Sequence, residues 1–157
     1  MKNEKMVQEW LLYSKSDSDT ATYLLKTMRP APLEIICFHC QQAAEKLLKG
    51  LLVSKGIQFD KNHDLAYLIN LAKDGESISQ AVNLSCNRLS QHGVSTRYPG
   101  KTQVNESDAK TAIKDMNKIG VWVKNQFEKM REQEEKEQKK SAEKSQKAKD
   151  DNYGYGR

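Results

Sequence analysis

The chain has 157 residues, with 26 Lys or Arg against 21 Asp or Glu and a formal net charge of +5. This length predicts one domain of ordinary size, and the charge permits contact with nucleotides, RNA or acidic proteins but falls short of the basic stripe typical of duplex binding. No apolar run approaches the roughly 20 residues that a membrane span needs, and the N-terminus is too polar for a secretory signal. We therefore expect a cytoplasmic protein that does not engage membranes.

The first half of the chain predicts two long helices. Apolar residues recur at helical spacing over residues 7–28, and Pro30 and Pro32 then stop the pattern. A second run over residues 33–55 is apolar around most of its circumference, which is typical of a helix at the centre of a bundle. Gly56 stands where a helix C-terminal stop is expected.

Two shorter helices should follow. Asn62 can cap the first of them, which should end near Gly75. Ser77 and Gln80 have capping-box spacing at the start of the next, and His92 lies on its apolar face.

The stretch 93–107 has no apolar period and should be a long loop, and the last helix should begin at Ser107 or Asp108. Because no alternating strand pattern occurs, we expect an all-α, up-and-down antiparallel bundle of four main helices plus one short helix. The bundle should occupy residues 1–130. Residues 131–157 are almost devoid of large apolar side chains and should form a charged, frayed or disordered tail.

Cys37 and Cys40 have the spacing of a zinc knuckle or a redox pair. A structural zinc site needs a second pair of ligands, and a thioredoxin-like site needs a βαβ setting, neither of which the sequence offers. The sequence also lacks a hydrolytic triad, a phosphate-binding glycine loop and a dinucleotide fingerprint. We therefore expect two packed thiols, no metal and no cofactor.

The second helix carries four polar residues at helical spacing, which places them along one side with acid and base close enough to pair. They are Gln42, Glu45, Lys46 and Lys49. Composition alone favours a solvated face, and a functional site is the alternative.

The same segment resembles the HEPN domain family. Residues 38–49 read FHCQQAAEKLLK, followed by His-Asp-Leu at 63–65 and Arg-Tyr-Pro at 97–99, in the order found in the family. The resemblance covers about residues 7–127. It implies a helical bundle, usually a homodimer, in a family often encoded beside a minimal nucleotidyltransferase. Some members are ribonuclease toxins, and others bind nucleotides or serve as partner modules.

The ribonuclease branch of that family is marked by an Arg followed, after four to six residues, by a His. No Arg of this chain has a His at that spacing; Arg88 and His92 are separated by only three residues, which predicts one helical turn between them. This departure favours a protein that is not an enzyme. It leaves open a metal-independent ribonuclease toxin in which Arg88 binds phosphate and His92 transfers a proton.

The preferred hypothesis is a non-catalytic HEPN module that binds a nucleotide or phosphate-bearing ligand and pairs with a nucleotidyltransferase, in a toxin–antitoxin type of arrangement. The candidate ligand-binding residues are Lys46, Lys49, His63, Asp64, Arg97 and Tyr98, with Gln42 and Glu45 in support. Lys and Arg would hold phosphate, an aromatic ring would stack on a base, and first-turn amides near His63 would accept an anion.

Two other interpretations stay open. Arg97 could pair with Glu45 while Tyr98 packs on the bundle, which would anchor the loop. The chain could also be a structural dimer whose charged tail recruits a partner.

Overall fold

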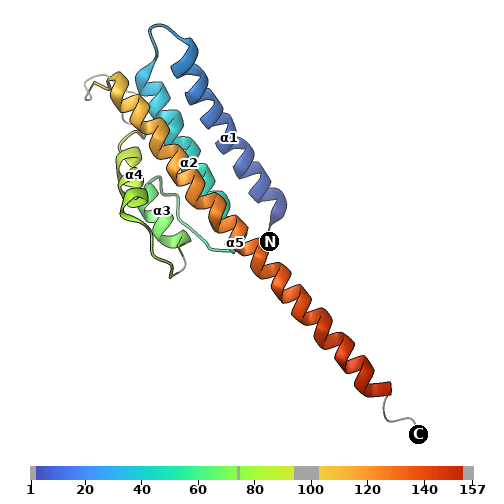
Figure 1. Cartoon of the computed structure of the whole chain (residues 1–157). Coiled ribbons are helices and arrows are strands. Elements are labelled where there is room, and N and C mark those ends of the chain that lie inside the picture. Colours follow the sequence, from blue (N-terminus) through green and yellow to red (C-terminus); the bar gives the residue numbers. More distant parts are fainter. Residues whose placement is uncertain (1–2, 74, 94–102, 154–157) are drawn as a thin grey trace. The chain divides into compact units, whose positions relative to one another are not determined.

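The computed structural model describes residues 3–73, 75–93 and 103–153, with side chains described as far as residue 146. These ranges form five helices and no strand: α1 Glu4–Thr27, α2 Leu33–Lys55, α3 Leu65–Ala72, α4 Gln80–Ser90 and α5 Glu106–Tyr153. The predicted all-α, up-and-down bundle is therefore confirmed (Figure 1). No helix in these ranges combines the length and apolar character needed to cross a bilayer.

The α2 helix lies at the centre of the bundle, as its apolar circumference predicted. It contacts α1, α3 and α4, and the part of α5 up to Val123 runs beside it (Figure 1). The largest fully buried apolar side chains are Val7, Ile36, Leu48, Leu51, Leu52, Leu65, Leu68, Ile69, Leu89, Ile119 and Val123. Burial of each such side chain stabilises the fold by roughly 1.5–3 kcal/mol, so this shared core supplies the main driving force for assembly.

Gly50 sets how closely α1 approaches α2. A Cβ atom at this position would lie 3.1 Å from Trp10 Cβ and 3.6 Å from Leu11 Cδ2. Glycine in a helix interior costs roughly 1 kcal/mol relative to alanine. The close contact explains why glycine is tolerated here, and it brings polar groups of the two helices within hydrogen-bonding distance.

Two of the predicted helix starts are wrong by two residues. Asn62 does not cap α3; its side chain accepts a hydrogen bond from Asp64 N at 2.8 Å, and Asp64 then caps the helix by accepting from Ala66 N at 2.9 Å. The cap of α4 is Ser79, which accepts from Val82 N, and not Ser77. In both places several polar residues could serve as caps, and the packed position of the helix selects one of them.

The last helix begins at Glu106, close to the predicted start. Asn105 and Asp108 cap it reciprocally, because each side chain accepts a hydrogen bond from the backbone N–H of the other, at 2.9 and 3.0 Å. This is a capping-box arrangement.

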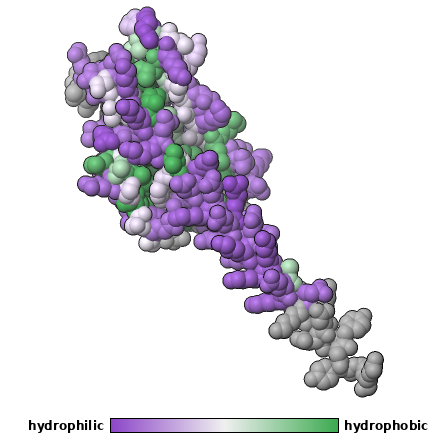
Figure 2. All heavy atoms as spheres, in the orientation of Figure 1, coloured by the Kyte–Doolittle hydropathy of each residue, from purple (hydrophilic) through white to green (hydrophobic). Residues whose placement is uncertain are grey.

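The chain divides into two compact units, residues 1–123 and residues 124–157. In the second unit α5 stays helical to Tyr153, and the coloured part of its surface in Figure 2 is almost uniformly hydrophilic. The domain boundary at residue 130 and the frayed tail stay predictions, and residues 154–157 lie outside the described part of the chain.

Candidate functional site

A first ionic group joins α1 to α2. Asp17 Oδ1 lies 2.8 Å from His39 Nδ1, and Asp17 Oδ2 accepts a hydrogen bond from Lys46 Nζ. We call these three residues the Asp17 cluster. The Asp17 side chain is 12% exposed, whereas those of His39 and Lys46 are both 25% exposed. The two basic groups are thus more accessible to solvent than the carboxylate that holds them.

Lys46 belongs to the binding set predicted from the sequence, whereas Asp17 and His39 do not. The signal that could have found Asp17 lies in α1, where Val7, Ser14, Asp17 and Ala21 are the buried residues. A carboxylate at core spacing on an amphipathic helix needs a partner from a neighbouring element, because an unpaired buried charge is strongly unfavourable. The basic residues of α2 supply that partner.

A second ionic group surrounds Glu45, whose side chain is 5% exposed. Its carboxylate accepts hydrogen bonds from Lys49 Nζ at 2.7 Å and Gln41 Nε2 at 3.0 Å, and His63 Nδ1 lies 3.0 Å from Oε1. We call these four residues the Glu45 cluster. Burial raises the pKa of Glu45, but the hydrogen bonds from Lys49, Gln41 and His63 outweigh burial and hold that pKa below its usual value. Gln42 extends the cluster by donating to Gln41 Oε1 at 2.7 Å.

The solvated face that composition favoured for this side of α2 is wrong for Glu45 and Lys49, whereas Gln42 and Lys46 are half-buried. Glu45 and Lys49 are 4% and 7% exposed, and their neighbours come from α1 through Trp10 and from the segment leading to α3 through Phe59 and His63. Lys49 Nζ lies 5.8 Å from the ring centroid of Trp10 and 5.8 Å from that of Phe59. Attraction between a cation and two aromatic rings adds to the ion pair and fixes the position of this ammonium group.

Asp64 has a structural task at the start of α3. Its Oδ1 atom accepts from Ala66 N, and Ser90 Oγ accepts from Leu65 N at 2.9 Å. The sequence predicted that first-turn amides near His63 would bind an anion. In the structure the amides of Leu65 and Ala66 already donate hydrogen bonds to side chains of the protein.

The structure brings together Lys46, Lys49, His63, Gln42 and Glu45 of the predicted binding set along α2 and the start of α3. Arg97 and Tyr98 lie outside the described residues. The predicted pairing of Arg97 with Glu45 therefore stays a prediction. The binding role of the set stays a prediction.

The Arg88 side chain is bound to α5. Its Nε and Nη2 atoms donate to the two carboxylate oxygens of Asp115 at 2.7 and 2.6 Å, and Ser85 Oγ donates to the same carboxylate at 2.8 Å. Asp115 is 3% exposed. A bidentate pair with a buried carboxylate is a strong and geometrically specific contact, and it commits the guanidinium to holding α4 against α5.

The expected placement of Arg88 and His92 one turn apart on a helix is wrong. The α4 helix ends at Ser90, and His92 lies beyond it in a turn, where its backbone N–H donates to Leu89 O at 2.9 Å. Among the described residues no group bonds its buried Nδ1 atom. Burial lowers the pKa of His92 despite the opposing effect of Asp108 and Asp115, so the imidazole favours its neutral form.

The three cysteines are buried in the core as free thiols. Burial raises the pKa of Cys37 and of Cys86 to about 12, and it also raises the pKa of Cys40. Within the described ranges no group of three or more His, Cys, Asp or Glu side chains is placed to hold a metal ion. These thiols are therefore packed core groups of low nucleophilicity.

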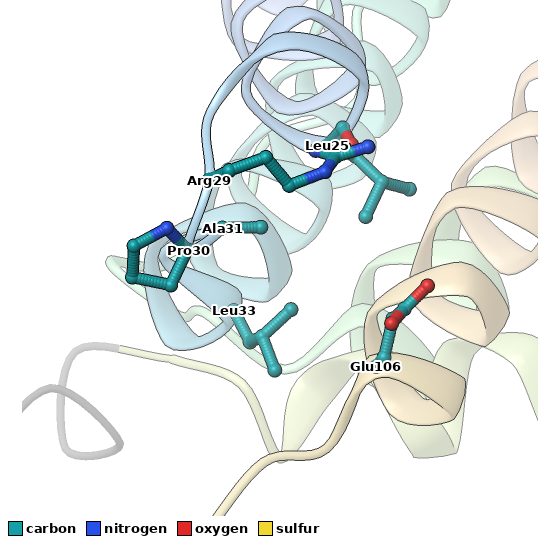
Figure 3. Close-up of a pocket in the computed structure, with 6 residues that line it drawn as sticks. All are labelled: Leu25, Arg29, Pro30, Ala31, Leu33 and Glu106. Carbon is teal, nitrogen blue, oxygen red and sulfur yellow. Dashed lines mark hydrogen bonds between the residues drawn. The ribbon is translucent and has the colours of Figure 1, made fainter.

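A surface pocket of about 300 Å³ lies at the turn between α1 and α2, beside the first turn of α5 (Figure 3). It is lined by Leu25, Arg29, Pro30, Ala31, Leu33 and Glu106. Arg29 Nη1 donates to Leu25 O at 3.2 Å and to Met28 O at 2.6 Å, so this guanidinium closes the C-terminus of α1. None of the predicted binding residues lines this pocket.

Comparison with known proteins points to one family. The model of the HEPN domain matches residues 7–126. The crystal structure of an archaeal HEPN homologue is 27% identical, with a TM-score of 0.60, over 76% of this chain and 96% of that one. A crystal structure of a protein from Thermus thermophilus has 23% identity and a TM-score of 0.66 over the same shares, which is a likeness of fold. No curated protein matches the chain.

Proposed function

Because the chain belongs to the HEPN domain family, we propose that it is a non-catalytic, homodimeric HEPN module that binds a nucleotide or another phosphate-bearing ligand. We further propose that it associates with a nucleotidyltransferase partner in a pair of the toxin–antitoxin type. The observation that carries the proposal is the row of basic side chains that α2 and the start of α3 gather beside aromatic rings.

Phosphate suits this row. Lys46 and His39 are partly open to solvent, and the His63 side chain is 70% exposed. Lysine ammonium groups and protonated histidines make short, charge-assisted hydrogen bonds to phosphate oxygens. A ligand would draw on groups that the carboxylates of Asp17 and Glu45 already hold in place, so little side-chain entropy would be lost on binding.

The pairing of Arg88 supports a non-catalytic role. Catalysis of RNA cleavage without metal needs a cation aimed at the phosphate and a group that transfers protons. In this chain the guanidinium of Arg88 is bound to Asp115, and burial disfavours the protonated form of His92. Arg88 links α4 to α5, and His92 lies in the turn that follows α4 with its Nδ1 atom buried.

Isothermal titration tests ligand binding. The purified chain is titrated with ATP, GTP and a short single-stranded RNA, and the titrations are repeated with Lys46→Met and Arg97→Ala. Lys15→Ala is the matched control, because Lys15 is a 70% exposed lysine paired with Asp19 within α1. We expect saturable nucleotide binding that both test variants weaken at least tenfold and the control retains. Absence of binding to every ligand would refute the nucleotide site.

Co-purification with a nucleotidyltransferase encoded beside this chain tests the partner. We expect a stable complex with the full chain and with a chain truncated after residue 130. If the full chain forms the complex and the truncated chain does not, the result would instead favour recruitment of the partner through the charged tail. Cleavage of the RNA probe that disappears in a folded His92→Ala variant would establish the ribonuclease alternative.

A further inference from the structure

One aromatic residue beside the Asp17 cluster is exposed rather than packed. Tyr13 lies one turn before Asp17 on α1 and is 61% exposed. Lys46 Nζ lies 6.0 Å from the centroid of its ring. The same ammonium group bonds Asp17, so Lys46 bridges two successive turns of α1 and stands next to an open aromatic surface.

Lys46 and Lys49 of α2 differ in how they are held. The Lys49 side chain is 9% exposed, paired with a 5% exposed carboxylate and placed between two rings. The Lys46 side chain is 25% exposed and more open than its own carboxylate partner. An anion arriving from solvent therefore meets Lys46 and His39 before it meets Asp17, whereas Lys49 is already enclosed.

We propose that Tyr13, His39 and Lys46 form a nucleotide site, in which Lys46 and His39 bind the phosphates and the base stacks on the Tyr13 ring. This inference rests on the proposed function and narrows it, because it assigns binding to the Asp17 cluster and a structural role to Lys49. Stacking on an aromatic ring tolerates any base, since each base has a π face. The proposed ligand class is a nucleotide of any base, because the site offers one exposed ring for the base and two basic groups for phosphate.

The test compares ATP with inorganic tripolyphosphate, which carries the phosphates without a base. Titrations use the full chain, Tyr13→Leu and Tyr13→Trp. The control is Tyr23→Leu, because Tyr23 is 65% exposed and lies ten residues further along the same helix, about 15 Å away. Both tyrosines face solvent, so these substitutions should leave the fold intact, which circular dichroism and a thermal melt would verify.

We expect the full chain to bind ATP roughly tenfold more tightly than tripolyphosphate, in line with the contribution of base stacking. Tyr13→Leu should remove this preference and leave tripolyphosphate binding unchanged. Tyr13→Trp should retain the preference, and the new indole fluorescence should change on addition of ATP but not of tripolyphosphate. Tyr23→Leu should behave like the unaltered chain.

The outcomes separate the two proposals. If both ligands bind and Tyr13→Leu leaves their affinity ratio unchanged, the site at Tyr13 is overturned while the proposed function stands. The site at Tyr13 is also overturned, and the proposed function still stands, if the full chain binds ATP and tripolyphosphate equally well. If neither ligand binds the full chain, the proposed function fails, and the site at Tyr13 fails with it.

Discussion

Two helix pairs of this molecule use charged residues in opposite ways. Between α4 and α5 a single buried carboxylate, Asp115, takes two hydrogen bonds from Arg88 and one from Ser85. Between α1 and α2, Asp17 is shared by two different basic groups, each of which offers it one contact. Both arrangements leave basic side chains partly open to solvent, 46% for Arg88 and 25% each for Lys46 and His39. They differ in pairing, because both carboxylate oxygens of Asp115 are taken by one guanidinium, whereas those of Asp17 are divided between an ammonium and an imidazole.

This difference separates a structural ion pair from a candidate binding site better than sequence spacing does. Arg88 and His92 come close to the spacing of a ribonuclease motif, yet Arg88 forms a bidentate pair with the buried Asp115, and the Nδ1 atom of His92 is buried. Lys46 and Lys49 match no catalytic motif, and each lies beside an aromatic ring, Lys46 partly open to solvent and Lys49 enclosed. The geometry of its ion pair, more than its exposure, separates Arg88 from Lys46.

The largest effect is expected at Glu45. Glu45→Leu removes a 5% exposed carboxylate and leaves the ammonium of Lys49 buried without its partner. Breaking a buried pair in this way costs about 3–5 kcal/mol. Urea denaturation would measure the loss, with the exposed residue change Lys15→Ala as the control. A loss below about 1 kcal/mol would show that the Glu45 cluster opens to water more readily than its burial implies.

Gly50→Leu tests the close contact between α1 and α2 that allows Asp17 of α1 to reach the basic residues of α2. A leucine would force its Cβ to within 3.1 Å of Trp10 Cβ, and the rest of the side chain would have to displace α1. Overpacking of this kind costs typically about 1–3 kcal/mol, to which the loss of Asp17 contacts would add. We expect a lower urea midpoint and weaker nucleotide binding. Gly120→Leu is the matched control, because a Cβ there meets only Leu47 Cδ2 at 3.8 Å.

Arg88→Ala tests the ion pair between α4 and α5. It leaves Asp115 buried with Ser85 as a donor, and we expect a loss of about 2 kcal/mol, because the Arg88 side chain is 46% exposed and water can replace it. Nucleotide binding should not change. Chemical denaturation and titration of the same sample would show whether stability and binding separate. A loss of binding with full stability would place Arg88 in a functional site instead.

The smallest effect is a pH dependence at His92. Its pKa in the folded chain is lowered, so the unfolded chain takes up the proton first, and the free energy of unfolding should fall as the pH drops below about 6.5. His92→Leu removes this contribution. Denaturation curves at pH 7 and pH 5 should therefore differ less for His92→Leu than for the unaltered chain. An equal difference in both proteins would mean that His92 is solvated in the fold.

The fold could be predicted from the sequence in large part because apolar spacing is a local signal. The bounds of α2 follow directly from its apolar run, Pro32 and Gly56. The pattern marks most of the apolar residues that α2 buries, but it also marks Ile35, which is 44% exposed, and it misses the buried Glu45 and Lys49. The caps of α3 and α4 could not be predicted, because Asn62 and Asp64, or Ser77 and Ser79, are equally suited to the task. Tertiary packing makes that choice.

The candidate site was predicted in part. Lys46, Lys49, Glu45 and His63 share one region, as helical spacing and the family resemblance implied. Asp17 was not identified as a member, because it lies on another helix and its partners are 22 and 29 residues away in the chain. The spacing of residue types within one helix does not indicate which residue 22 or 29 positions away will pair with Asp17.

The sequence by itself determined the helical class, the central place of α2 and the departure from the ribonuclease motif. These properties depend on the order of residue types along one segment. Only the tertiary structure decided that Glu45 and Lys49 are enclosed and that Arg88 is paired with Asp115. It also showed that Lys46 stands beside the open ring of Tyr13. The physical reason is that burial and charge pairing depend on which helices meet, and helix spacing alone does not encode the partner.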